Sequence, residues 1–148
     1  MTVTNKLPYT QTELKARALK RVAMVLQGHA EEGRFPHSRF FERLVPDSWI
    51  TEGISVKGSE HPEHVVPCAF LARACMERFD AGATVDEIAE ILETNLRIVR
   101  ISREEQIHID FELGYKSTMP PGWVLGESDP LERLTVGKIV LRDRPDES

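Results

Sequence analysis

Cysteine is scarce in this chain, and long apolar runs are absent. Among 148 residues only Cys68 and Cys75 carry thiols, too few for a zinc ribbon or a disulfide framework. No apolar run reaches the roughly 18 residues needed to span a membrane, and residues 1–7 lack the apolar segment of a secretory signal. We therefore expect one domain with a single hydrophobic core, in a reducing cytoplasm.

Basic residues are outnumbered, which argues mildly against a protein that binds nucleic acid along its whole surface. The formal net charge is −5. Residues 1–58 hold nine Lys/Arg against six Asp/Glu, whereas residues 59–148 hold ten against eighteen. The basic N-terminal part can contact phosphates, and a bound cation would offset part of the acidic charge. Ordinary scatter of surface charge explains the same counts, so the sequence leaves both interpretations open.

Hydrophobic periodicity predicts a chain that mixes helices with short strands. Helices are predicted at 12–27, 38–44, 68–79, from 84 onward, 102–113 and 130–134. Strands are predicted at 49–56, 64–67, 96–101 and 138–141. The predicted fold class is therefore α+β.

Local signals set the ends of several of these helices. Ser102 with Glu105 three residues later forms a capping box. A similar box is predicted to begin the helix at Thr84. Gly28 and Gly114 are predicted to end the first helix and the helix at 102–113, because glycine readily adopts the left-handed conformation that follows a helix.

Three short segments carry residues that could take part in catalysis or bind a metal ion. The first is Glu63-His64-Val65-Val66-Pro67, the second is Asn95-Leu96, and the third contains Glu104 and His108. Glu104 and His108 are four residues apart on a predicted helix, which places both side chains on one face, about 5–6 Å apart at Cβ. The same spacing on a helix suits two ligands of one metal ion.

These segments resemble the HNH, or ββα-metal, nucleases over residues 60–109. In that family an acidic residue or His precedes a catalytic His in a segment that often ends with Pro, and a loop Asn follows. In its colicin-type members the metal ligands lie nine and thirteen residues after the Asn, and here Glu104 and His108 occupy those positions. Glu104 stands where the family more often has His or Asn. Thirty residues separate His64 from Asn95, which is more than in compact members.

The resemblance implies a ββα-metal core at 59–114, a helical N-terminal extension with a strand at 1–58 and a C-terminal extension at 115–148. A helical insertion at about 80–93 would account for the long spacing. The implied roles are a general base (His64), a residue that holds its loop (Asn95), one divalent metal on Glu63, Glu104 and His108, and phosphate contacts from Arg97, Arg100 or Arg103. Magnesium or manganese would suit the metal site, with nickel or zinc as alternatives.

Each residue also has a structural interpretation, so three functions remain open. His64 suits a hydrogen-bonded core position, Asn95 a turn, and Glu104 the first turn of a helix. The first function is a metal-dependent endonuclease or nickase acting on DNA in a bacterial or phage setting. The second is a catalytically degraded HNH-like scaffold that binds a protein partner. The third is a purely structural phage or accessory protein.

Overall fold

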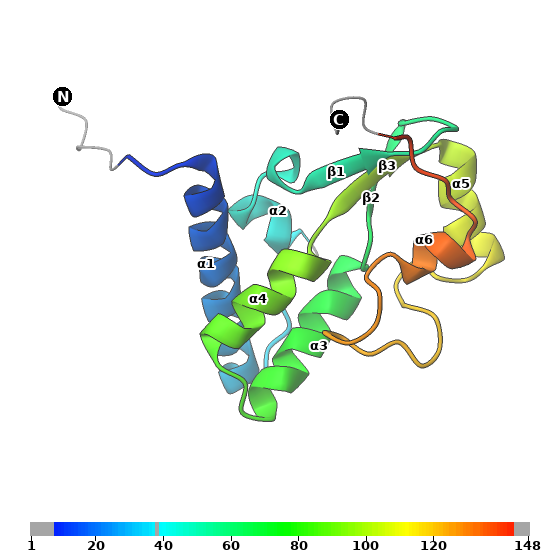
Figure 1. Cartoon of the computed structure of the whole chain (residues 1–148). Coiled ribbons are helices and arrows are strands. Elements are labelled where there is room, and N and C mark those ends of the chain that lie inside the picture. Colours follow the sequence, from blue (N-terminus) through cyan, green and yellow to red (C-terminus); the bar gives the residue numbers. More distant parts are fainter. Residues whose placement is uncertain (1–7, 38, 144–148) are drawn as a thin grey trace.

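Helices lie at both ends of a small sheet in the computed structural model, which describes residues 8–37 and 39–143 (Figure 1). The described helices are α1 (Gln11–Glu32), α2 (Phe40–Leu44), α3 (Cys68–Asp80), α4 (Val85–Asn95), α5 (Arg103–Ile107) and α6 (Glu132–Val136). A 3-10 turn, η1 (Asp47–Trp49), precedes the first strand, and a π-helical turn, η2 (His108–Glu112), continues α5. The predicted α+β class is confirmed. Within the described ranges, no helix combines the length and apolar character needed to cross a membrane.

The sheet has three short strands, β1 (Thr51–Ile54), β2 (His61–His64) and β3 (Ile98–Ile101), in the order β1-β3-β2. Strand β3 pairs in parallel with β1 and antiparallel with β2. Because α5 follows β3 directly, the chain forms an antiparallel strand pair followed by a helix. The prediction of a strand at 138–141 is wrong. Of these four residues only Leu141 forms a β-bridge, to Ser55 directly after β1.

Helix α1 is longer than the sequence pattern predicted. It begins at a capping box between Thr10 and Glu13, and it ends at Gly33, which has a φ of 69°. Gly28 lies inside the helix and does not end it, contrary to the prediction. The alanine and the two glutamates that follow are good helix formers, and they sustain the hydrogen-bond ladder across Gly28.

Two whole helices, α3 and α4, separate β2 from β3. The predicted insertion at about 80–93 therefore covers only part of this excursion. The capping boxes at Thr84 with Glu87 and at Ser102 with Glu105 are both confirmed, with their reciprocal side-chain and backbone hydrogen bonds. Gly114, with a φ of 77°, follows η2 as predicted. Helices α1, α3 and α4 pack together at one end of the sheet, and α5 and α6 lie at the other (Figure 1).

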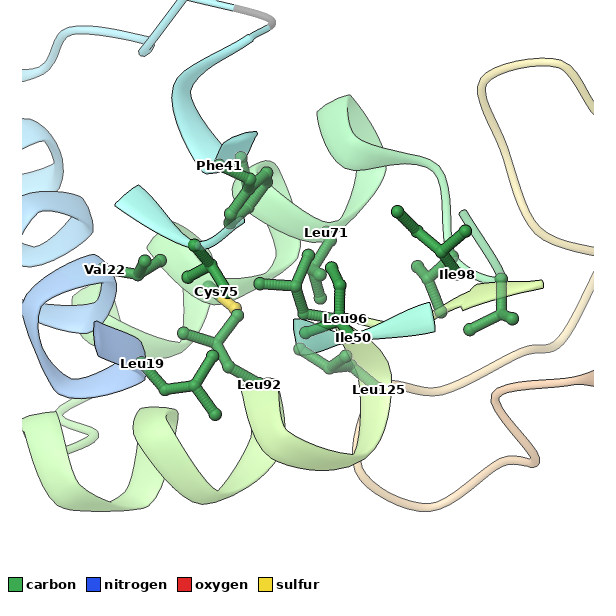
Figure 2. Packing of buried hydrophobic residues seen from close by; sticks show 14 of the residues in the cluster. Leu19, Val22, Phe41, Ile50, Leu71, Cys75, Leu92, Leu96, Ile98 and Leu125 are labelled. Carbon is green, nitrogen blue, oxygen red and sulfur yellow. The ribbon is translucent and has the colours of Figure 1, made fainter. Parts of the chain in front are cut away.

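One hydrophobic core joins the helices to the sheet (Figure 2). Its fully buried side chains come from α1, α3, α4, β3 and the segments beside the strands, and include Leu19, Leu26, Ile50, Leu71, Ile88, Leu92, Leu96 and Ile98. Burying each such side chain contributes about 1.5–3 kcal/mol. This core fixes β2 and β3 in place, and the candidate site is built on those strands.

Candidate functional site

Strand β2 presents its polar side chains to two different faces. His61 and Glu63 alternate with Pro62 and His64, as the twofold repeat of a strand requires. Glu63 turns toward α6, where it meets Arg133. His64 faces a hollow on the other side of the strand, which it shares with Asp47 of η1. The two neighbours that the sequence assigned to one catalytic centre therefore point into different surroundings.

Arg133 of α6 is a buried cation that ties β2 to η2. Its side chain is 1% exposed and forms an ion pair with the Glu63 carboxylate. The guanidinium also donates to the backbone oxygens of His64, at 2.5 Å, and Tyr115, at 3.0 Å. One of its nitrogens lies 4.0 Å from the Asp110 carboxylate. The Arg133 guanidinium thus lies between β2 and η2.

The Glu63 carboxylate has two partners within the chain. One oxygen pairs with Arg133, and the other lies 3.0 Å from Nε2 of His61. Glu63 is also buried, with 6% of its surface exposed. To bind a metal ion, this carboxylate would have to give up a buried ion pair. The arrangement therefore does not fit the metal-ligand role predicted for Glu63.

Glu104 and His108 lie four residues apart on the helical segment formed by α5 and η2, as their spacing predicted, and they line one hollow together with Glu105. Both line a hollow of about 630 Å³ beside α5 and the segment after α6, and Glu63 is not part of its wall. Glu104 is exposed, and Nδ1 of His108 lies 2.5 Å from the Glu112 carboxylate. The inward positions of this helical segment are instead held by Glu105 and Ile109.

The predicted metal ligands are not brought together. In the part of the chain that the structure describes, no three His, Cys, Asp or Glu side chains converge closely enough to hold a metal ion. Glu104 and His108 are neighbours, whereas Glu63 belongs to the buried cluster with Arg133.

His64 has the protonation state that a general base requires. Burial lowers its pKa from the ordinary value of 6.5, although the negative charges of Asp47 and Glu42 act in the opposite direction. The imidazole is therefore mainly neutral at pH 7. Its Nδ1 is buried and has no hydrogen-bond partner among the described residues. Cys68 lines the same hollow, and because burial raises the pKa of its thiol to about 12, it is not a nucleophile at neutral pH.

The lowered pKa of His64 predicts that acid destabilises the protein. Below pH 6.5 the unfolded chain takes up a proton at this position more readily than the folded chain does, so unfolding becomes easier as the pH falls through the folded-state pKa. Above about pH 6.5 this contribution is fully present. Urea unfolding between pH 7.5 and 5.5 should show a steeper loss of stability for the parent than for His64→Gln. The exposed His37→Gln should keep the parental slope, and equal slopes for all three proteins would contradict the assignment.

Asn95 is buried near the end of α4, and its amide serves its own helix. The side-chain nitrogen donates to the Ile91 carbonyl oxygen at 2.8 Å and to the Thr94 hydroxyl at 3.2 Å. The amide oxygen is buried without a partner, and within the described ranges no hydrogen bond joins Asn95 to His64 or its loop. The predicted role of holding that loop therefore has no contact to support it.

Two of the three candidate phosphate-binding arginines are engaged within the chain. Arg97, directly before β3, pairs with Glu52 on β1 at 2.5 Å. Arg100 donates from Nε to the Ser59 carbonyl oxygen at 2.8 Å. The side chain of Arg103 remains exposed and lines the 630 Å³ hollow with Glu104. Of the three, Arg103 is the one most accessible to an anion.

Sequence reasoning did not single out Arg133 or the contact between Ser55 and Glu105. Arg133 stands in Leu131-Glu132-Arg133-Leu134, which resembles an ordinary charged helix. Ser55 donates to the Glu105 carboxylate at 2.9 Å and thereby links the end of β1 to α5. The capping box identified Glu105 as a cap, but it gave no signal for this second contact.

Comparisons with protein-family models, curated proteins and solved structures found no match for this chain.

Proposed function

We propose that this chain is a protein-binding module built on an HNH-like strand–strand–helix scaffold, and that it does not act as a metal-dependent nuclease. One observation carries the proposal: the guanidinium of Arg133 pairs with Glu63, the carboxylate that the metal would require. The two terminal nitrogens of Arg133 have protein acceptors, and its Nε is buried without a hydrogen-bond partner among the described residues. The contact between β2 and η2 is thus stabilised by the guanidinium of Arg133, a cation that belongs to the chain itself.

The burial of Arg133 makes metal binding at Glu63 energetically unfavourable. A metal ion on Glu63 would separate this carboxylate from a guanidinium that is 1% exposed. Leaving a buried charge without its partner costs about 3–5 kcal/mol. The metal would also lack the second and third ligands expected of it, because Glu104 and His108 line a separate hollow.

Exposed apolar side chains support a binding role. Ile107 is 44% exposed and Phe111 is 64% exposed on the α5–η2 segment, and Val136 and Val140 are 42% and 60% exposed near α6. Met24 is 54% exposed on α1. Exposed apolar residues that gather at particular places on a surface often mark sites of protein–protein interaction.

The proposal predicts that divalent metals have no effect on the purified protein. We expect Mg²⁺, Mn²⁺, Ni²⁺ and Zn²⁺ to leave its thermal unfolding midpoint unchanged, and we expect no plasmid nicking with any of them. The measurements are differential scanning fluorimetry and supercoiled-plasmid cleavage, with His64→Ala prepared identically. Metal-dependent nicking that disappears in His64→Ala would refute the proposal and establish a nuclease.

The second candidate function is hydrolysis of DNA phosphodiester bonds with His64 as general base. It is favoured by the neutral imidazole and by the unpartnered Nδ1 of His64. In that case Glu104→Gln and His108→Gln should also reduce nicking, because these are the predicted ligands that share a hollow. If both variants retained full activity, the predicted metal site would be wrong even for an active nuclease.

A further inference from the structure

A groove with an apolar floor lies between the second half of α1 and α2. It has a volume of about 500 Å³, within the range of roughly 300–1,000 Å³ that is typical of ligand clefts. Val25, Pro36, Phe40 and Leu44 supply its apolar surface. Val25 is 37% exposed.

The groove is lined by basic side chains and by no carboxylate. Its polar lining residues are His29, His37 and Arg43, and the described lining contains no Asp or Glu. Arg43 is exposed and forms no ion pair with any described residue. His29 packs edge-on to the Phe40 ring, with 6.5 Å between the ring centroids, and its Nδ1 has no partner among the residues described.

Nearby acidic residues do not neutralise this groove. Glu32 at the end of α1 pairs with Arg34 at 2.7 Å, and Glu42 of α2 pairs with Arg39 at 3.7 Å. Both carboxylates therefore have cations of their own. The groove combines an apolar floor with an uncompensated guanidinium at its edge, which is complementary to a ligand that is apolar on one side and negatively charged on the other.

We propose that this groove binds an acidic amphipathic segment of a partner protein. Apolar side chains at helical spacing would enter between Val25 and Leu44, and a carboxylate beside them would pair with Arg43. This inference rests on the proposed binding function and names its partner class. The apolar floor favours a peptide over a nucleic-acid backbone, because phosphates would gain contacts only at the edge of the groove.

The test uses three synthetic peptides of about 15 residues, added to the full ¹⁵N-labelled chain. The first has Leu at helical spacing and Glu at the other positions, the second has Lys in place of Glu, and the third has the acidic composition with the Leu positions scrambled. We expect backbone amide shifts around Val25, Phe40 and Leu44 with the first peptide, and at least about tenfold weaker binding of the other two.

Two variants and two matched controls locate the contact. Arg43→Glu and Val25→Asp should each weaken binding of the acidic amphipathic peptide by about tenfold or more. Arg21→Glu changes an exposed arginine of α1 outside the groove lining, and Val140→Asp changes an exposed valine elsewhere. Both controls should bind within about twofold of the parent.

Other outcomes would overturn the inference. These are equal binding of the Lys peptide, equal loss in Arg43→Glu and Arg21→Glu, shifts confined to α5 and α6, or shifts in the groove caused by a DNA duplex and not by the peptide. The metal and nicking assays test the broader proposal separately. If the acidic amphipathic peptide does not bind the groove and metals have no effect, the inference about the groove is wrong, and the proposed binding function would require another face. If metal-dependent nicking is found, the proposed binding function is wrong regardless of the peptide results.

Discussion

Replacing Arg133 with methionine should lower the free energy of unfolding by about 3–5 kcal/mol. The substitution keeps a long side chain in the same space but removes the charge that Glu63 contacts. Because Glu63 is only 6% exposed, its carboxylate would be left buried without the guanidinium, with His61 as its remaining partner. The backbone oxygens of His64 and Tyr115 would also lose their donors. Equilibrium urea unfolding at pH 7, followed by circular dichroism, measures the loss.

Two further variants separate the buried charge from the volume of the side chain. Adding Glu63→Gln to Arg133→Met should restore part of the stability, because it removes the buried carboxylate that the first substitution deprives of its guanidinium. Arg21→Met changes an exposed arginine and should cost less than about 0.5 kcal/mol. A loss below about 1 kcal/mol in Arg133→Met would mean that the guanidinium does not hold β2 against η2.

Helix ends were predicted well where the signals are local. The capping boxes at Thr84 and Ser102 involve residues only three positions apart, so the sequence contains both partners of each hydrogen bond. The end of α1 was misplaced because Gly28 and Gly33 have the same local propensity, and only Gly33 adopts a positive φ. The identity of the residue could not decide which glycine would end the helix.

Strand positions depended on contacts that lie far apart in the sequence. The strand predicted at 64–67 begins after Pro62, which cannot donate a backbone hydrogen bond, whereas β2 spans His61–His64 and includes this proline. In the sheet order β1-β3-β2, however, β2 lies at an edge, where proline is tolerated. The placement of β3 between β1 and β2 requires pairing across two helices. No local pattern specifies that pairing.

In the candidate site, too, local features were predictable from the sequence and contacts between distant residues were not. Spacing correctly predicted that Glu104 and His108 share a face of one helix, because that follows from helical geometry alone. It could not predict which face turns inward, since this depends on the burial of Glu105 and Ile109 against the rest of the fold. Residue spacing also could not predict the ion pair between Glu63 and Arg133, because the two residues are 70 positions apart in the sequence.

Replacing Glu105 with alanine should cost about 2–4 kcal/mol in the free energy of unfolding, because its carboxylate has two buried partners. One oxygen accepts from the Ser102 backbone nitrogen at 2.9 Å and completes the cap of α5. The other accepts from the Ser55 hydroxyl, also at 2.9 Å, and connects that helix to the end of β1. Urea unfolding measures the loss, and Glu105→Gln should retain part of the stability because its amide oxygen can still accept one hydrogen bond.

The adjacent Glu104→Ala is the matched control, and it also tests the orientation of the whole helix. Glu104 is exposed, so its removal should change stability by less than about 0.5 kcal/mol. If Glu104→Ala cost as much as Glu105→Ala, the helix would be rotated relative to the structure, and Glu104 would turn inward toward the sheet. The metal site predicted from the sequence would then regain a geometric basis. A large difference between these neighbours would instead place the buried carboxylate of α5 in a structural role, as the contact with Ser55 indicates.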